Sequence, residues 1–376
     1  MIRLLKISDY YQSFLQQSED EGSASYLQAW HRLMDRRFGW FDMWKRVLEE
    51  TGHFSVREIV ANDALTQGLW WREHADVHRT PSADEILEEQ IRQFRPDAIF
   101  INNVAVTRPQ KWRRWSELAP RQSLLFAYDG LGIHRPESYR ELSFILSPLH
   151  RFCDRCLEAG VEACPFRPGF PSPCTDLESA EKNLGTVFIG GVGTGREGHG
   201  PRLQFLDEIA REAPIEFYLS GLGPGQISWG KQIRRLFRGQ VREARACRNL
   251  HAKNRGPIFG REMFQALGKS RGSLNYHVAV AGEEGVNMRI YESTGMGSCL
   301  LTEERPNLRN LFEVDAEILT YRSRREAVEK IDWIEQNPKK AREIARAGQA
   351  RTLRDHTLEK QILGVGEILR QKLGSG

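Results

Sequence analysis

Residues 284–297 read Glu284-Gly-Val-Asn-Met-Arg-Ile-Tyr-Glu292-Ser-Thr-Gly-Met-Gly297, so two glutamates eight positions apart flank an expected helix that runs into a turn of small residues. A helix beginning near Gly285 would direct free N–H groups and the positive end of its dipole at an anion. The carboxylates of Glu284 and Glu292 could then bind hydroxyl groups on either side of a phosphate. This pattern fits a nucleotide-sugar site, and an ordinary surface helix with two solvated acids fits the spacing equally well.

The residues around this stretch indicate an α/β protein. Ser298 to Thr302 form a short apolar run of strand length, so the local order is turn, helix, turn and strand. Strands that alternate with helices predict parallel pairing with right-handed crossovers, and ligands outside the carboxyl ends of the strands. The expected strands are residues 2–8, 57–61, 98–101, 123–127, 144–147 and 161–166, followed by 185–190, 216–220, 273–275, 299–302 and 317–321.

Length and composition set the class of protein. A chain of 376 residues exceeds one ordinary core and predicts two domains, and 40% hydrophobic with 28% charged residues is typical of a globular protein rather than a disordered one. No apolar run approaches the roughly 20 residues of a membrane span, and the first residues are too short for a signal peptide, so we expect a cytoplasmic protein. A net charge of +4 gives no reason to expect nucleic acid as a partner.

Several short motifs carry a family resemblance. Glu284 and Glu292 fit the E-x7-E pattern of retaining GT-B glycosyltransferases of the group-1 type. The chain more closely resembles the glycosyltransferases related to spore maturation proteins (the CgeB-like family). That resemblance rests on residues 287–292, 295–297, 300–302, 307–312 and 351–357, with looser matches at 38–44, 58–62, 67–73 and 160–170.

The resemblance implies two Rossmann-like domains that face each other across a cleft. Residues 1–175 would form the acceptor domain, 183–355 the nucleotide-sugar donor domain, and 356–376 a C-terminal helix that crosses back to the first domain. The implied activity is transfer of a hexosyl-type sugar from a nucleoside diphosphate sugar, with retention and without a metal or other cofactor. The acceptor (lipid-linked, protein or small molecule) and the oligomeric state are left unspecified. A nucleotide-sugar epimerase and a non-catalytic nucleotide-sugar binder are the alternatives on this fold.

The resemblance also implies roles for single residues. Glu292 would accept hydrogen bonds from the ribose, Glu284 would contact the sugar hydroxyls as a catalytic residue, and Arg289 would supply countercharge or pair with one of these acids. The amides of residues 285–287 would cradle the distal phosphate, and Tyr276 would stack on the base or wedge between helices. The donor-binding candidates on these segments are Gly285, Val286, Asn287, Arg289, Glu292, Thr294, Gly295, Asn275 and Tyr276.

A glycine-rich loop follows the expected strand at 185–190. Gly191, Gly193 and Gly195 would let backbone N–H groups approach a phosphate without interference from a Cβ. The loop lacks the Lys-Ser/Thr of a P-loop. Arg196 and Arg202 are nearby cations that could neutralise phosphate charge. The resemblance to GT-B proteins implies that this loop contacts the donor diphosphate or the acceptor.

In the first domain, Asp129 ends a strand at its carboxyl edge and His134 lies in the loop beyond. Both are candidate catalytic residues, because substrates gather at that edge.

Two further patterns remain open. Residues 231–255 hold nine Lys or Arg and one acid, which is typical of a solvated face but could also receive an anionic acceptor or a membrane surface, as a peripheral contact. Cys153, Cys156, Cys164 and Cys174 could form a zinc or iron–sulfur site. A plain helix–strand step with free thiols explains them better, and we expect no metal, since only one Cys-x-x-Cys pair is present.

Overall fold

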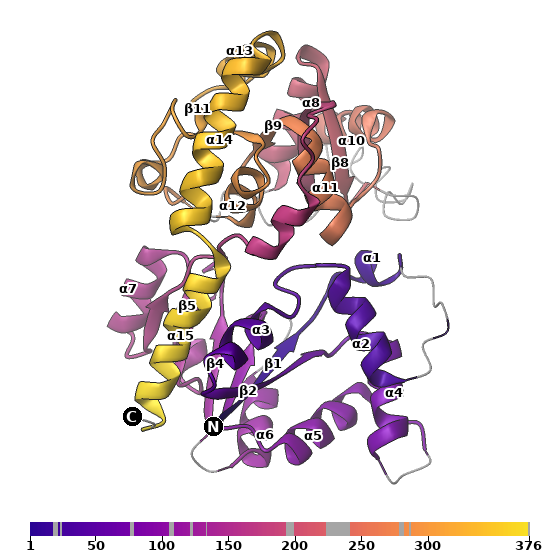
Figure 1. Cartoon of the computed structure of the whole chain (residues 1–376), viewed down its shortest axis with the longest axis vertical. Helices are drawn as coiled ribbons and strands as arrows, with labels where there is room; N and C mark the ends of the chain where they lie inside the picture. Colours follow the sequence, from indigo (N-terminus) through magenta and orange to yellow (C-terminus); the bar gives the residue numbers. More distant parts are fainter. Residues whose placement is uncertain are drawn as a thin grey trace. The chain divides into compact units, whose positions relative to one another are not determined.

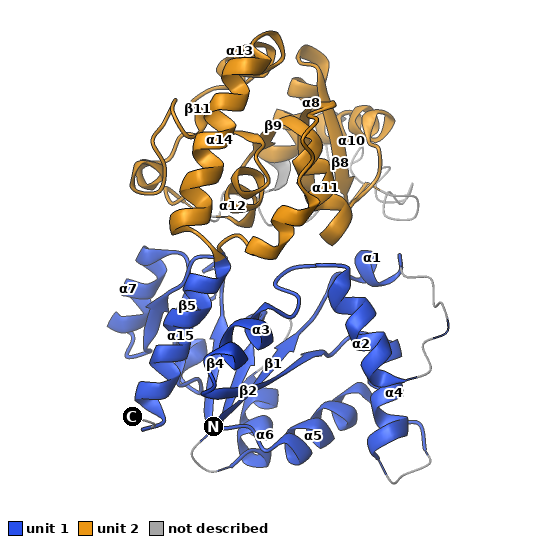
Figure 2. Cartoon of the chain, viewed as in Figure 1, with its two compact units in different colours: residues 1–168, 358–376 blue, residues 169–357 orange. Residues whose placement is uncertain are grey.

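The computed structural model describes residues 1–17, 22, 25–75, 79–104, 109–120, 123–132, 134–192, 199–222, 241–277, 282–285 and 287–374, except the side chains of 199, 200 and 241. The chain divides into two compact units (Figure 2). Unit 1 consists of residues 1–168 and 358–376, and unit 2 of residues 169–357. Each unit is built on one parallel sheet, as the sequence predicts.

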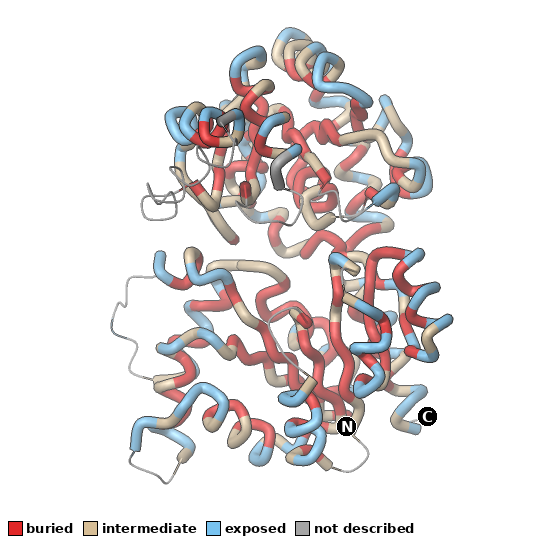
Figure 3. The backbone as a smooth tube through the Cα atoms, turned by 180° about the vertical axis from the view of Figure 1, so that it is seen from behind, coloured by how far each residue is buried: buried red, intermediate tan, exposed pale blue. Residues whose placement is uncertain are grey.

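The sheet of unit 1 has the strand order β2-β1-β3-β4-β5-β6 with parallel pairing. Its strands are buried at nearly every position (Figure 3), as expected for a parallel sheet covered on both faces. The strands are β1 (Ile2–Ser8), β2 (Phe54–Val60), β3 (Ala98–Ile101), β4 (Leu124–Tyr128), β5 (Phe144–Ser147) and β6 (Ala163–Pro165).

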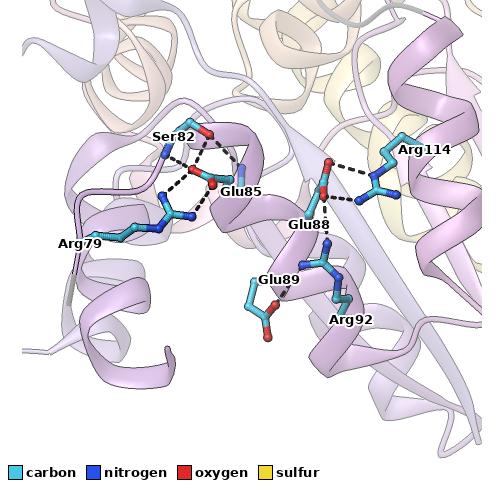
Figure 4. Close-up of polar contacts among 7 residues, drawn as sticks. All are labelled: Arg79, Ser82, Glu85, Glu88, Glu89, Arg92 and Arg114. Carbon is cyan, nitrogen blue, oxygen red and sulfur yellow. Dashed lines mark hydrogen bonds and ion pairs between the residues drawn. The ribbon is translucent and has the colours of Figure 1, made fainter. Parts of the chain in front are cut away.

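The tryptophans of helices α4 and α6 of unit 1 are buried. Helix α5 starts at a capping box in which Ser82 and Glu85 bond each other's backbone N–H groups (Figure 4). Glu88 of α5 also accepts hydrogen bonds from Arg92 and from Arg114 of α6. The helices are α1 (Gln12–Leu15), α2 (Tyr26–Asp35), α3 (Met43–Glu50), α4 (Ala64–His74), α5 (Ala83–Phe94), α6 (Pro109–Leu118) and α7 (His150–Glu158), with a 3-10 turn η2 (Pro136–Tyr139).

Helix α15 (Leu358–Lys372) follows unit 2 in the sequence and packs on unit 1, against α3 (Figure 1). The two helices approach closely at Gly366 of α15, where an added Cβ would lie 2.8 Å from Cδ2 of Leu48 in α3. At the far end, Lys372 Nζ donates to Glu162 Oε2 at 2.7 Å. The expected return of the C-terminal helix to the first unit is therefore confirmed.

The sheet of unit 2 has the order β11-β10-β9-β7-β8, again all parallel. In both units the second strand pairs on one side of the first and the later strands continue on the other side, so the two sheets share one topology. The strands are β7 (Leu184–Gly191), β8 (Ile215–Ser220), β9 (Ser270–Asn275), β10 (Cys299–Glu303) and β11 (Leu319–Tyr321).

The helices of unit 2 form two groups in contact: α8 with α10 and α13, and α12 with α11 and α14. The helices are α8 (His199–Glu212), α10 (Val241–Lys253), α11 (Gly260–Lys269), α12 (Met288–Gly295), α13 (Arg324–Gln336) and α14 (Pro338–Asp355), with 3-10 turns η3 (Ser172–Leu177) and η5 (Pro306–Asn310).

Candidate functional site

The topology of unit 2 predicts where a ligand binds. The order of its strands reverses at β7, because β8 pairs on one side of β7 and β9 on the other. In open parallel sheets, ligands bind outside the carboxyl ends of the strands at such a reversal. The residues that follow β7, β9 and β10 are therefore the first candidates, and several of the expected site residues lie there.

Arg202 of α8 is a largely buried cation at this edge. Its guanidinium lies over the ring of Phe188, 5.2 Å from the centroid, and its Nη2 would be 2.8 Å from a Cβ at Gly190, so glycine leaves room for it. Among the described residues, Arg202 has no ion-pair partner, and its buried Nε has no hydrogen-bond partner. Burial lowers the pKa of Arg202 to about 10, and the positive charge of Arg289 acts in the same direction. The charge of Glu303 acts in the opposite direction, but Arg202 forms no direct ion pair in the described ranges. A partly buried cation that lacks a direct ion pair is costly, which favours an anionic ligand here.

Helix α12 carries the second glutamate of the pair. Asn287 caps the helix by accepting the N–H of Ile290 at 3.3 Å. Arg289 and Glu292 form an ion pair, with 2.8 Å between Nη1 and Oε2. Glu292 is only 6% exposed, and burial raises the pKa of its carboxyl, opposed by the charge of Arg289. The sequence analysis named both Glu284 and Glu292 as possible partners of Arg289, and the structure shows the ion pair with Glu292.

The start of α12 corrects one expectation. The helix begins at Met288 rather than near Gly285, because Asn287 supplies the cap. The N–H of Gly285 donates to Oδ1 of Asn307 at 2.8 Å and is not free for a phosphate. Glu284, just before it, is partly exposed.

Asn275 at the end of β9 is hydrogen-bonded to the residue that caps α12. Its Oδ1 accepts from Nδ2 of Asn287 at 3.0 Å, and its Nδ2 donates to Oγ1 of Thr302 at 2.9 Å. Its backbone oxygen accepts from the hydroxyl of Tyr321 at 2.9 Å. Its neighbour Tyr276 is partly exposed and packs against Phe205, with 4.8 Å between ring centroids.

His277, Glu303 and Arg305 form a polar cluster that sequence reasoning missed. The backbone N–H of His277 donates to Oε2 of Glu303 at 2.7 Å, and Nη2 of Arg305 lies 3.5 Å from Oε1 of the same carboxylate. Burial lowers the pKa of His277. Burial opposes ionisation of Glu303, but its bonds with His277 outweigh that effect and lower the pKa of the carboxyl. The signal was present, because Glu303 ends β10 at the same edge as Asn275.

Thr294 and Gly295 have packing roles in the structure. The hydroxyl of Thr294 donates to the backbone oxygen of Ile290 at 2.7 Å and lies 2.6 Å from the hydroxyl of Thr352. A Cβ at Gly295 would overlap the ring of Phe170. These contacts hold α12 against its neighbours, and the donor-binding role of the two residues stays a prediction.

The candidates of unit 1 lie in the loop after β4. Both carboxylate oxygens of Asp129 are occupied: Oδ1 accepts from the N–H groups of Leu131 and Gly132, each at 2.8 Å, and Oδ2 accepts from the Tyr139 hydroxyl at 2.6 Å. We therefore assign Asp129 to the structure of its loop. His134 meets Tyr139 edge-on, with 6.2 Å between ring centroids. Its buried Nε2 has no hydrogen-bond partner in the described part of the chain.

Other expected residues lie outside the described ranges: Gly193, Gly195, Arg196, Val286 and residues 231–240 of the basic run. Gly191 ends β7, paired with Ser220 of β8. The four clustered cysteines are free thiols, and no group of three or more His, Cys, Asp or Glu is placed to hold a metal ion among the residues described. No described helix is long and apolar enough to cross a membrane.

Comparison with known proteins places this site in context. Residues 197–363 match a family model described as glycosyl transferase-like, a span that includes Arg202, Glu284 and Glu292. No curated protein sequence matches the chain significantly.

Solved structures resemble the chain over its whole length. A glycosyltransferase from Rickettsia africae is 13% identical with a TM-score of 0.57, covering 100% of this chain and 99% of its own. Sucrose-phosphate synthase from Thermosynechococcus elongatus is 13% identical with a TM-score of 0.59, and HepE from Anabaena, solved with UDP-glucose, is 11% identical with a TM-score of 0.58, each with full coverage of both chains. The chain therefore has the GT-B fold of these proteins, and residues 197–363 match the glycosyl transferase-like family.

Proposed function

We propose that this protein is a glycosyltransferase that moves a sugar, of the hexosyl type, from a nucleoside diphosphate sugar to an acceptor. The family match over residues 197–363 and the GT-B fold support this class of reaction. The complex of HepE with UDP-glucose supports a nucleotide sugar as the donor. From the sequence resemblance we further propose retention at the anomeric carbon, no requirement for a metal or other cofactor, and a place near the spore-maturation group.

The observation that carries the proposal is the pair of guanidinium groups of Arg202 and Arg289. The two positive charges are close enough to disfavour one another, and Arg202 forms no direct ion pair among the described residues, although the charge of Glu303 acts on it in the favourable direction. A diphosphate would supply the missing negative charge. When the glycosidic bond breaks, negative charge grows on the leaving diphosphate, so cations fixed beforehand at that place stabilise the transition state.

The carboxylates would position the two ends of the donor. We propose that Glu292 accepts hydrogen bonds from the ribose and that Glu284 contacts the sugar hydroxyls. Tyr276, which is partly exposed at the same edge, would contact the base. Asn275 and Asn287 bind each other, and this bond would fix the start of α12 relative to β9.

A nucleotide screen tests the phosphate role. UDP, GDP, ADP, CMP and dTDP are compared by thermal shift, because a ligand that binds the folded state raises its melting temperature. Arg202→Gln should lower the affinity for the preferred nucleotide by about 1.5–3 kcal/mol, the range for a hydrogen bond to a charged group. Arg325→Gln is the control, because Arg325 is an exposed arginine of the same unit. Equal nucleotide affinity in the two variants would show that Arg202 does not bind the phosphate groups.

Glu292→Ala tests the ribose role separately. Its affinity for the same nucleotide should fall by about 1–3 kcal/mol, as for a lost buried polar contact. Unchanged affinity contradicts the assignment.

Turnover separates the three activities possible on this fold. Slow hydrolysis of one sugar nucleotide without an acceptor supports a transferase. Isomerisation of the donor supports an epimerase, and binding without any turnover supports a non-catalytic binder.

We also propose that the exposed face of α10 contacts an anionic acceptor or a membrane surface, with the protein acting in the cytoplasm. Arg242, Arg245 and Arg248 are exposed along this helix, and the described part of the chain offers them no acid partner. Binding to liposomes with anionic lipid should weaken as salt is added. Binding that is indifferent to salt would count against this contact.

A further inference from the structure

Unit 2 has a cationic hollow at the edge of its sheet opposite to Arg202. Its volume is about 220 Å³, and its lining includes Lys182, Arg271, Lys339 and Arg342 together with Gly297 and Pro338. Lys182 precedes β7, Arg271 is the second residue of β9, and Gly297 precedes β10. The hollow therefore lies at the amino edge of the parallel sheet, whereas Arg202 and Asn275 belong to the carboxyl edge.

The cations of this hollow outnumber the acids beside them. Lys182, with a side chain only 11% exposed, lies 3.5 Å from the carboxylate of Glu178, and Arg271 pairs with Glu335. Arg342 donates to the backbone oxygen of Ala180 at 3.2 Å. Within the described ranges, neither Arg342 nor Lys339 has an ion-pair partner. Two positive charges are thus left without a carboxylate.

The hollow also takes in the start of α14. This helix of 18 residues begins at Pro338, and Asn337 provides no side-chain cap. Its first turn has no acid and instead holds Lys339 and Lys340. Cations at the positive end of a helix dipole are unfavourable. An anion bound there would accept hydrogen bonds from the uncapped N–H groups and would offset the positive charge of the lysines.

Lys182 connects the hollow to α12. Its Nζ donates to the backbone oxygens of Gly268 at 2.7 Å and Met296 at 3.1 Å. Met296 is the C-cap of α12. An anion in the hollow would therefore contact the side chain that holds the far end of the helix carrying Arg289 and Glu292.

We propose that this hollow is a binding site for a small phosphate-bearing anion, such as inorganic phosphate, pyrophosphate or the phosphate group of a small ester. The side chains suit a phosphate group, because Lys339 and Arg342 have N–H donors without an acid partner in the described ranges. The guanidinium of Arg342 can bind phosphate with two parallel hydrogen bonds. The volume is below the roughly 300–1,000 Å³ of pockets that enclose drug-sized ligands, so the hollow is too small to enclose a complete nucleotide sugar. This site is independent of the function proposed above.

The experiment is a calorimetric titration of the full chain at fixed ionic strength. All proteins carry Arg202→Gln, so that anion binding at the carboxyl edge is weakened in every sample. Lys339→Gln/Arg342→Gln is compared with Lys340→Gln/Arg346→Gln, which removes the same charge from exposed positions of the same helix outside the hollow. Inorganic phosphate, pyrophosphate and glucose 6-phosphate are titrated separately.

We expect the first pair to weaken binding at least about tenfold, because it removes two charge-assisted contacts, and the second pair to change it little. The anion that binds most tightly then identifies the source of the phosphate group. Equal binding in the two pairs, or no binding of any of the three anions to the Arg202→Gln parent, would overturn the proposal. Either result leaves the nucleotide screen unaffected, so the two proposals fail separately.

Discussion

Lys6 of unit 1 is a fully buried cation and Arg202 of unit 2 is a partly buried one, and they differ in what surrounds them. Lys6 is 1% exposed, with its Nζ 2.5 Å from Oε2 of Glu58 and 3.1 Å from the backbone oxygen of Phe41. Glu58 accepts a further bond from the N–H of Lys45 at 2.8 Å. Arg202 has no such partners among the described residues. A buried charge whose partners the chain supplies belongs to the structure, whereas one left without a partner indicates that a ligand supplies it.

The largest expected effect on the free energy of unfolding comes from breaking the buried ion pair of Lys6 and Glu58. Lys6→Met leaves the carboxylate of Glu58 buried without its counter-charge, which should lower the free energy of unfolding by about 3–5 kcal/mol. Denaturant unfolding followed by tryptophan fluorescence measures this, because seven of the nine tryptophans (30, 40, 44, 70, 71, 112 and 115) belong to unit 1. Lys6→Met/Glu58→Gln should recover part of the loss. A single variant as stable as the parent would mean that the pair contributes nothing.

Removing the unpartnered cation should have the opposite sign. Arg202→Gln takes away a buried charge that Arg289 repels, so the unliganded protein should keep its stability or gain up to about 1 kcal/mol. The measurement is thermal unfolding without nucleotide, beside Arg325→Gln. A clear loss of stability in Arg202→Gln would show that its packing on Phe188 matters more than its charge.

The smallest effect concerns a third buried basic group. Burial lowers the pKa of His277 below its ordinary value of about 6.5, so the folded state holds this ring neutral while the unfolded state still binds a proton. The contribution of neutral His277 to the free energy of unfolding is therefore fully present above about pH 6.5. It is lost as the pH falls from there toward the pKa of His277 in the folded state. His277→Gln should show a shallower loss of stability than the parent over that interval. Parallel pH profiles would contradict this expectation.

The sequence predicted the sheets better than the site, for physical reasons. Strands such as β1 and β7 are short apolar runs, and their parallel pairing follows from the alternation with helices. The capping role of Asn287, which moves the start of α12 to Met288, is a local signal that could have been recognised. The bond that occupies Asp129 comes from Tyr139 in a later turn, and spacing alone does not reveal it. The cluster of His277, Glu303 and Arg305 joins two strands that are neighbours only in the folded sheet.

The placement of α15 has a consequence for how the chain is made. The surface of α3 around Leu48 emerges from the ribosome early, but the helix that covers it is synthesised only after all of unit 2. Unit 2 can therefore be synthesised in full while unit 1 still lacks α15 and part of its apolar surface is uncovered. During that interval the nascent N-terminal unit is the part of the protein most exposed to chaperones and to aggregation.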